Sequence, residues 1–304
     1  MRICSLLPGA TEIAFALGLG EDLVGVTHEC DYPPEARHKP VVVRTSIDSH
    51  RMTSLEIDRA VSERVRNNQS LYTIDETRLR EAAPDIILTQ GLCDVCAIDY
   101  SEVVAAGETL PHKPKIVSLA PNSFNDVLSD IRRVGEATGQ SDKAEMFVRE
   151  LEHRIAAVRD RAAQSSTRPG VACLEWFDPI YFAGHWIPEM VELAGGRDVL
   201  GRKGEPSDKI AWEKVVELAP DVIVLMPCGY DVQRTLNEAS LLKKREGWRD
   251  LPAVATGKVY AVNGHAFFSR PGPRLVDGLE ILANLIDPEI FPVQIPPDSV
   301  QKVA

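Results

Sequence analysis

The chain has 304 residues and a net charge of −11, with 44% hydrophobic and 26% charged residues. This length is enough for two ordinary domains and a large buried core. The acidic balance disfavours a nucleic-acid partner, which needs a basic face, and no apolar run approaches the roughly 20 residues that span a bilayer. We therefore expect a globular, monomeric protein.

The N-terminal stretch MRICSLLPGATEIA (1–14) has one basic residue and no long apolar segment. It lacks the pattern of a secretion signal, which predicts a cytoplasmic protein for the sequence as written. A mature or wrongly started sequence would instead indicate the periplasm or the cell surface. In the cytoplasm the six cysteines would be reduced rather than paired in disulfides.

The chain repeats one order of elements, which indicates two similar halves. Each half has a strand, a helical segment, a helix that ends at Ala-Pro-Asp before an apolar strand, and a further strand. The matched pairs are RICSLL (2–7) with GVACLEW (170–176), 12–25 with 189–201, EAAPDIILTQGLCD (81–94) with ELAPDVIVLMPCGYD (217–231), and 113–122 with 256–265.

The strands are apolar along their whole length rather than alternating, as in DIIL (85–88) and DVIVL (221–225). This pattern is typical of parallel sheets that are covered by helices on both faces. We therefore predict an α/β fold with two parallel-sheet lobes, over residues 1–122 and 168–304, and a ligand cleft between them.

A helical connector over residues 123–167 is predicted between the lobes. Apolar residues recur at helical spacing from Ala144 to Val158, which predicts one helix over 141–164 with Ser141 as its N-cap. Such a helix is roughly 36 Å long and stiff, so we expect little hinge motion between the lobes.

Ligands of parallel sheets bind beyond the carboxyl ends of the strands, so the loops there are candidate binding loops. They carry imidazoles, thiols and aromatic rings, which suit a large, flat and mostly uncharged ligand. Cys4 and Cys173 lie inside strands and are predicted core thiols, and Trp212 and Trp248 are predicted packing residues. The candidate ligand-binding residues are His28, Cys30, Gln90, Gly91, Leu92, Cys93, Cys96, Trp176, Phe177, His185, Trp186, Cys228, His265, Phe267, Phe268 and Arg270.

The Cys-x-x-Cys of Cys93 and Cys96 allows three interpretations. The two thiols line the pocket; or they join Cys30 and His28 in a metal site; or they form a redox pair. A single such motif is weak evidence for metal, so the pocket interpretation is preferred. A histidine of these loops could also ligate the metal of a bound cofactor.

The motifs SLLPGATE (5–12) and THECDYP (27–33), with the paired Ala-Pro-Asp segments and the long helix, resemble the cobalamin-binding subgroup of the iron-siderophore and vitamin B12 substrate-binding proteins of ABC importers. The resemblance covers residues 2 to about 285. It implies a bilobed receptor that holds one corrinoid between its lobes and has no intrinsic cofactor. It also implies docking to ABC transporter membrane subunits through a carboxylate on each lobe. In the second lobe this carboxylate is Glu213. The internal repeat aligns Glu213 with Thr77 in the first lobe, so the first-lobe carboxylate would be the adjacent Glu76, one residue out of register.

No catalytic motif is recognised, so the preferred hypothesis is non-catalytic corrinoid binding. One alternative is an enzyme or metal-handling protein that uses a cysteine-rich cleft on a corrinoid or thiol. Another is a protein that binds an iron chelate.

Overall fold

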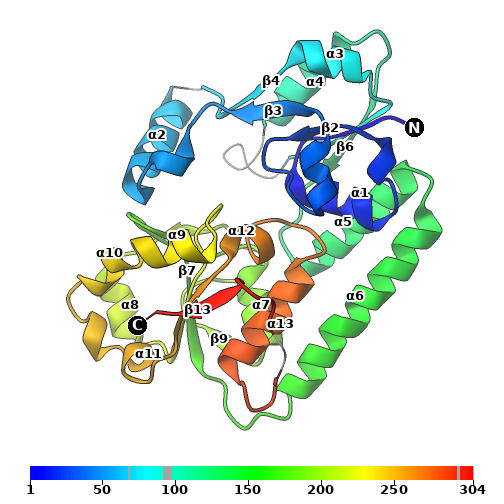
Figure 1. Cartoon of the computed structure of the whole chain (residues 1–304). Helices are drawn as coiled ribbons and strands as arrows, with labels where there is room; N and C mark the ends of the chain where they lie inside the picture. The colour runs from blue at the N-terminus through cyan, green and yellow to red at the C-terminus, as the bar shows by residue number, and fades with distance from the viewer. Residues whose placement is uncertain (68, 92–97, 293–294, 304) are drawn as a thin grey trace.

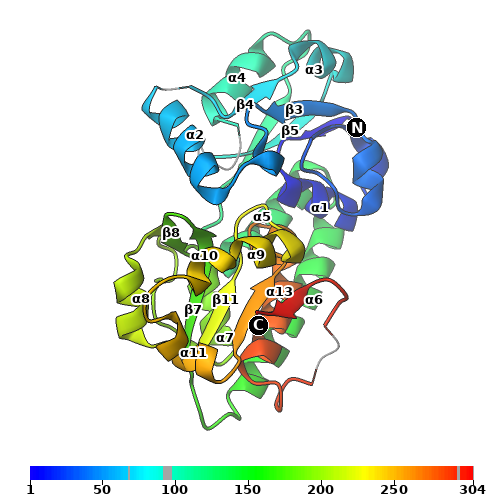
Figure 2. The ribbon, with the colours of Figure 1, turned by 60° about the vertical axis from the view of Figure 1, so that its left-hand side comes forward.

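A computed structural model describes residues 1–67, 69–91, 98–292 and 295–303. Two α/β lobes lie one above the other, and a single long helix runs along both (Figure 1; Figure 2). The predicted fold class, with two sheet-containing lobes on a helical spine, is confirmed.

The first lobe contains a six-stranded sheet in the order β4-β3-β2-β1-β5-β6. Its neighbours pair in parallel except at β4, which is antiparallel to β3. Successive strand residues face opposite sides, so Ile3 packs toward one helical layer and Cys4 toward the other. The elements are β1 (Ile3–Ser5), α1 (Pro8–Ala16), β2 (Leu23–Thr27), β3 (Val41–Thr45), α2 (Ser54–Arg66), β4 (Tyr72–Ile74), α3 (Glu76–Ala82), β5 (Ile86–Gln90), α4 (Tyr100–Glu108) and β6 (Lys115–Leu119), with short 3₁₀ turns at η1 (Gly20–Asp22), η2 (Pro34–His38) and η3 (Ser49–Arg51).

The second sheet runs β10-β8-β7-β11-β12-β13, and β9 pairs with the start of β7. Its centre, β7-β11-β12, is parallel as predicted, but β8, β10 and β13 are antiparallel to their neighbours. The elements are β7 (Gly170–Phe177), β8 (Ile180–Phe182), α7 (Ile187–Leu193), β9 (Arg197–Asp198), β10 (Asp208–Lys209), α8 (Trp212–Leu218), β11 (Val222–Leu225), α9 (Val232–Glu238), α10 (Ser240–Lys243), η4 (Trp248–Asp250), α11 (Pro252–Ala255), β12 (Val259–Val262), α12 (Gly264–Phe267), α13 (Leu275–Ile286) and β13 (Val300–Lys302).

The connector forms two helices, α5 (Phe124–Ala137) and α6 (Ser141–Ala162). Helix α6 packs against α5 at one end and against α7 and α13 at the other. The predicted helix is confirmed, but its N-cap is Gln140, because Ser141 is already the first residue of the helix. Arg154 of α6 binds Asp277 at 2.6 Å and Glu280 at 2.7 Å on α13.

The Ala-Pro-Asp repeat has the same structural role in both lobes. Ala83 and Ala219 end α3 and α8 in the left-handed region, with φ of 38° and 44°. The carboxylate of the aspartate that follows accepts a hydrogen bond from the backbone at the start of the lobe's first strand. Asp85 accepts a 2.8 Å hydrogen bond from the backbone N–H of Arg2, and Asp221 accepts one of 2.7 Å from Gly170. The motif therefore joins each helix end to the sheet.

This anchor predicts a stability effect in the second lobe. Asp221→Ala should lower the free energy of unfolding by about 1–2 kcal/mol, because the N–H of Gly170 loses its charge-assisted hydrogen bond. Asp221→Asn keeps an acceptor oxygen and should lose less. Urea unfolding followed by circular dichroism measures both, and equal losses in the two variants would contradict this role.

Candidate functional site

Two groups of polar contacts connect the lobes across their facing surfaces. The first, here the ion cluster, joins Glu12, Glu29 and Asp31 of the first lobe to His265, Arg270 and Arg274 of the second. The second joins η3 and α2 of the first lobe to β7, β8, β10 and α9 of the second. The candidate site is the inter-lobe surface between these two groups.

Arg270 is the centre of the ion cluster and is 7% exposed. One of its nitrogens lies 2.5 Å from Asp31 Oδ1, and another donates to the Glu29 carbonyl at 2.8 Å. His265 also contacts Arg270 and lies 3.3 Å from Asp31 Oδ2. Burial by itself raises the pKa of Asp31, but the contacts with His265 and Arg270 outweigh it and hold that pKa well below its ordinary value.

Arg274 binds the buried carboxylate of Glu12 through two nitrogens, at 3.1 and 2.6 Å. Burial raises the pKa of Glu12, although the hydrogen bond and the charge of Arg274 act in the opposite direction. The lobes touch closely here, because a Cβ on Gly9 would lie 2.3 Å from the carbonyl oxygen of Pro271. The glycine of the Gly-Ala-Thr-Glu segment is therefore required by inter-lobe packing.

Aromatic rings form the second-lobe side of the other group. Trp176 and Tyr230 have ring centroids 5.3 Å apart, and the Arg234 guanidinium lies 3.8 Å from the Tyr230 ring centroid. Lys209 lies 5.3 Å from the ring of Tyr181. The rings of this aromatic face come from β7, β8 and the loop before α9, and β10 and α9 add the cations Lys209 and Arg234.

Several predicted ligand contacts lie in the protein core instead. Strand β7 continues through Trp176 to Phe177 and turns back into β8, so the first part of the predicted binding loop at 176–189 is a β-hairpin. Strand alternation then directs Phe177 into the core, where it is 0% exposed. Trp186 and Phe268 are also buried, and the Trp186 Nε1–H donates to the Phe268 carbonyl at 2.9 Å.

Cys30 is also buried, beside Val26 and Ala36. Its sulfur lies 3.0 Å from the Thr11 hydroxyl and 3.3 Å from that of Thr27, and burial raises the pKa of its thiol. Cys30 is 4% exposed and packs in this small core cluster rather than lining the cleft. The buried states of Cys4, Cys173, Trp212 and Trp248 confirm their predicted packing roles.

Other predicted residues do lie at or near the inter-lobe surface. Trp176 donates to the Ser54 carbonyl across the lobes at 3.1 Å, and His265 and Arg270 belong to the ion cluster. Phe267 is partly buried with Arg274 5.8 Å from its ring centroid, and His28 Nε2 lies 3.2 Å from Glu29 Oε1.

The remaining predicted residues are spread more widely. Gln90 is buried at the end of β5, Gly91 and Cys228 are exposed, and His185 is half-buried with a φ of 54°. Burial lowers the pKa of His185. Leu92, Cys93 and Cys96 lie outside the described residues, so the three interpretations of the Cys-x-x-Cys stay open.

The sequence pattern did not reveal Glu12, Asp31 and Arg274 of the ion cluster or Tyr181, Tyr230 and Arg234 of the aromatic face. Five of these residues stand in loops already proposed as binding loops, so their position was a usable signal: Glu12, Asp31, Tyr181, Tyr230 and Arg274. The role of helix α2 has no signature in local spacing.

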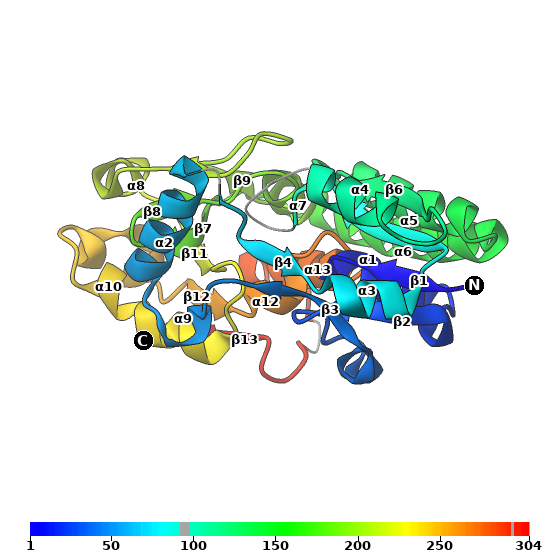
Figure 3. The ribbon, with the colours of Figure 1, turned by 90° about the horizontal axis from the view of Figure 1, so that it is seen from above.

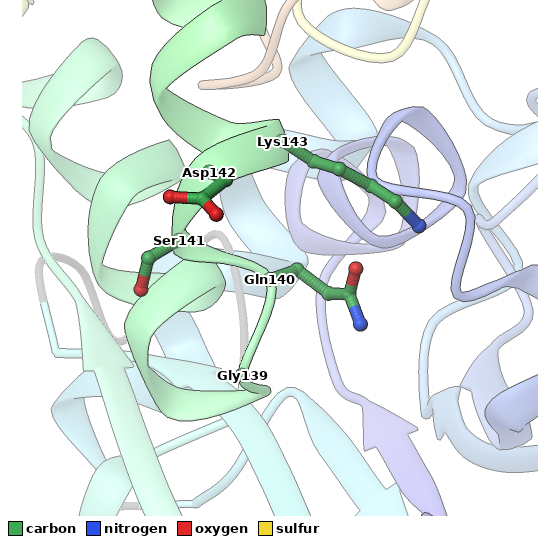
Figure 4. A pocket seen from close by; sticks show the side chains of 5 residues that line it. All are labelled: Gly139, Gln140, Ser141, Asp142 and Lys143. Carbon is green, nitrogen blue, oxygen red and sulfur yellow. The ribbon is translucent and has the colours of Figure 1, made fainter.

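Two pockets lie away from the inter-lobe surface. Figure 4 shows a pocket of 280 Å³ at the turn between α5 and α6, lined by residues 139–143. A second one, of 500 Å³, lies beside β13 and the end of α13. Among the residues that the structure describes, no three His, Cys, Asp or Glu side chains gather as a metal site, and no helix is both long enough and apolar enough to cross a membrane.

Comparisons with known proteins identify related chains. The model of the family described as periplasmic binding protein matches residues 3–265. An uncharacterized ABC transporter substrate-binding lipoprotein, YvrC of Bacillus subtilis, is 27% identical over 95% of this chain and 81% of its own. The vitamin B12-binding protein of Vibrio cholerae is 24% identical over 92% and 86%.

Solved structures share the fold. A periplasmic heme-binding protein from Pseudomonas aeruginosa superposes with a TM-score of 0.73 at 20% identity, covering 100% of this chain and 98% of its own. The vitamin B12-binding protein BtuF of Vibrio cholerae gives 0.66 at 22% identity, covering 96% and 98%. The names of these relatives, periplasmic proteins and a lipoprotein, do not support the cytoplasmic location expected from residues 1–14.

The ion cluster predicts a pH-dependent contribution to stability. The pKa of Asp31 is lower in the folded than in the unfolded chain, so its stabilising contribution is fully present above the unfolded pKa near 4. It is lost as the pH falls through the lower folded pKa. Asp31→Asn should therefore destabilise the protein at pH 7 and do so progressively less below pH 4.

Urea unfolding at pH 7, 4 and 3 measures this difference between wild type and variant. Glu21→Gln, at an exposed position outside the ion cluster, is the matched control. A difference that stays constant over this pH range would show that the Asp31 carboxylate is not held by the cluster.

Proposed function

Because the chain belongs to the periplasmic binding protein family, we propose that it is the substrate-binding component of an ABC importer and takes a corrinoid such as cobalamin between its lobes. Binding is non-catalytic, and the protein works on the outer side of the membrane that carries the transporter. The B12-binding and lipoprotein names of its relatives support this proposal.

The observation that carries the corrinoid proposal is the pairing of charges at the inter-lobe surface. In the described chain, His265, Arg270 and Arg274 face carboxylates of the first lobe, and Lys209 lies 3.6 Å from Asp58. The aromatic face adds flat apolar area from Trp176 and Tyr181, while Tyr230 is 2% exposed and packs beside Trp176. A large ligand rich in neutral amides needs shape and hydrogen bonds more than cations, which suits this surface.

The second candidate is haem or an iron chelate, because haem-binding proteins share the fold over nearly the whole chain. A ligand with free carboxylates would compete with Asp31 and Glu12 for their arginines. That competition costs binding energy, since each displaced carboxylate loses a charge-assisted hydrogen bond.

Calorimetric titration with cyanocobalamin, haemin and a ferric hydroxamate siderophore tests the proposal. We expect saturable 1:1 binding of cyanocobalamin, and Trp176→Ala should weaken it about tenfold, which corresponds to roughly 1.4 kcal/mol. Trp248→Phe, in the core away from the lobe interface, is the control for loss of an indole. Binding of haemin or the siderophore with no cobalamin binding would replace the corrinoid by the second candidate.

Transporter docking gives a separate prediction. Glu213 is exposed in the first turn of α8, and Glu76 is exposed in the first turn of α3, beside Thr77. Glu213→Lys should reduce uptake by a cell that depends on this protein and its cognate transporter, while ligand affinity in solution stays the same. Glu217→Lys reverses an exposed charge on the same helix and is the control; equal uptake in both variants would remove Glu213 from the docking surface.

A further inference from the structure

Helix α2 and the η3 turn before it, residues 49–66, form an arm that extends from one edge of the first sheet. The arm leaves β3 and returns into β4, the antiparallel edge pair, and Ser46 donates to the Leu71 carbonyl at 2.9 Å at its base. Figure 1 and Figure 3 show α2 apart from the first sheet and over the end of the second lobe that carries β8 and α9.

The arm is attached to the second lobe rather than to its own. In the described residues, every hydrogen bond or ion pair that links 49–66 to residues outside 46–71 ends on the second lobe. These contacts are Ser54 with Glu238, Trp176 with the Ser54 carbonyl, Arg234 with the Ser49 and Met52 carbonyls, Tyr181 with Asp58, and Lys209 with Asp58.

The contacts of the arm are mainly polar. Only Ser54 and Ile57 of α2 are buried, so little apolar surface holds the helix in place. The helix also carries its own N-terminal capping box, formed by Thr53 and Glu56, so it keeps its local stabilisation when it leaves the second lobe. A segment with few buried apolar contacts and solvent-replaceable hydrogen bonds belongs to the low-stability part of a fold.

Two side chains of α9 connect the arm to the aromatic face. Arg234 donates to the Ser49 and Met52 carbonyls, at 2.8 and 2.9 Å, while it lies over the Tyr230 ring. Glu238 accepts from the Ser54 N–H at 3.1 Å and from the Tyr230 hydroxyl at 3.0 Å. The docked arm therefore occupies the same side chains that form one wall of the candidate site.

We propose that residues 49–66 are a lid that undocks from the second lobe to admit ligand, with Glu238 and Arg234 as its latch. Helix α6 keeps the two lobes at a fixed angle, so access to the inter-lobe surface changes when the arm moves and not when the lobes hinge. The lid rests on the proposed function for its purpose, but its motion can be measured without any ligand.

Amide hydrogen exchange of the full-length protein, with no ligand added, tests the motion. Peptides from 49–66 should exchange at least a hundredfold faster than peptides from α6, and at least tenfold faster again in Arg234→Ala/Glu238→Ala. Gln233→Ala/Asn237→Ala, which removes an exposed hydrogen-bonded pair on the same helix, should leave the arm unchanged. An arm that exchanges as slowly as α6, or equally in both double variants, would overturn the proposal.

A reversible cross-link tests the link to ligand entry. Ser54→Cys/Glu238→Cys places two thiols on facing backbone positions, with the new thiol at position 238 set back because cysteine is shorter than glutamate, and Cys93, Cys96 and Cys228 are replaced by Ser so that they do not compete for oxidation. Mass spectrometry verifies the disulfide, and each protein is compared with its own reduced form. Association of cyanocobalamin and of haemin is followed by stopped-flow absorbance.

For a probe that binds the reduced form, oxidation should slow association at least tenfold, and dithiothreitol should restore it. Equal association rates in the two forms would mean that ligand does not pass the arm, which overturns the lid. If neither probe binds the wild-type protein, the proposed ligands are wrong, and the exchange experiment alone decides whether the arm opens.

Discussion

The arrangement of this protein depends on one continuous apolar core that passes from lobe to lobe along α6. Ala144 and Val148 pack with the α5 side of the first lobe, and Val158 and Ala162 pack in the same cluster with residues of the second. Opening the lobes by a large angle would break this core, at roughly 25 cal/mol for each Å² of apolar surface exposed. We therefore expect the lobes to move as one body, with the surface between them set before any ligand arrives.

If the angle between the lobes is constant, their facing surfaces must match in charge as well as in shape. The first lobe contributes carboxylates, Glu12 and Asp31 in the ion cluster, and the second contributes the guanidinium groups of Arg270 and Arg274. The buried charges of Glu12 and Arg270 would be costly alone, and each is paired across the interface. The pairs hold one edge of the interface closed. The opposite edge, under α2, is then the part that can open while exposing little apolar surface to water.

Much of this fold could be predicted from sequence because the signals are local. Continuous apolar strands such as DIIL give parallel sheet centres, helical spacing gives α6, and Ala-Pro-Asp marks the repeat. The candidate site was harder to predict because its residues meet through tertiary structure. Trp176 and Phe177 are adjacent in sequence, yet Trp176 faces the arm and Phe177 faces the core. The reason is that β7 continues into a β-hairpin that its apolar pattern did not indicate. Helix α2 is recognisable by its cap, but which lobe it would contact has no local signature.

The same pairing of charges bears on selectivity. A cation that already binds a carboxylate attracts a second anion only by giving up the first, so the ion cluster offers little net attraction to an acidic ligand. What the second lobe offers instead is the aromatic face, where Trp176 and Tyr181 would contact a flat ligand whatever its charge, and where the Arg234 guanidinium would lose the Ser49 and Met52 carbonyls as partners when the arm leaves. Under the proposed function, recognition would depend on the fit of a broad, neutral ligand between two lobes whose angle we expect α6 to hold constant. A ligand that is too thin would leave the rings partly in water, and one that is too thick would keep the arm from returning to Glu238. Such selection by thickness requires a constant angle between the lobes, and a receptor with a flexible hinge would not have it.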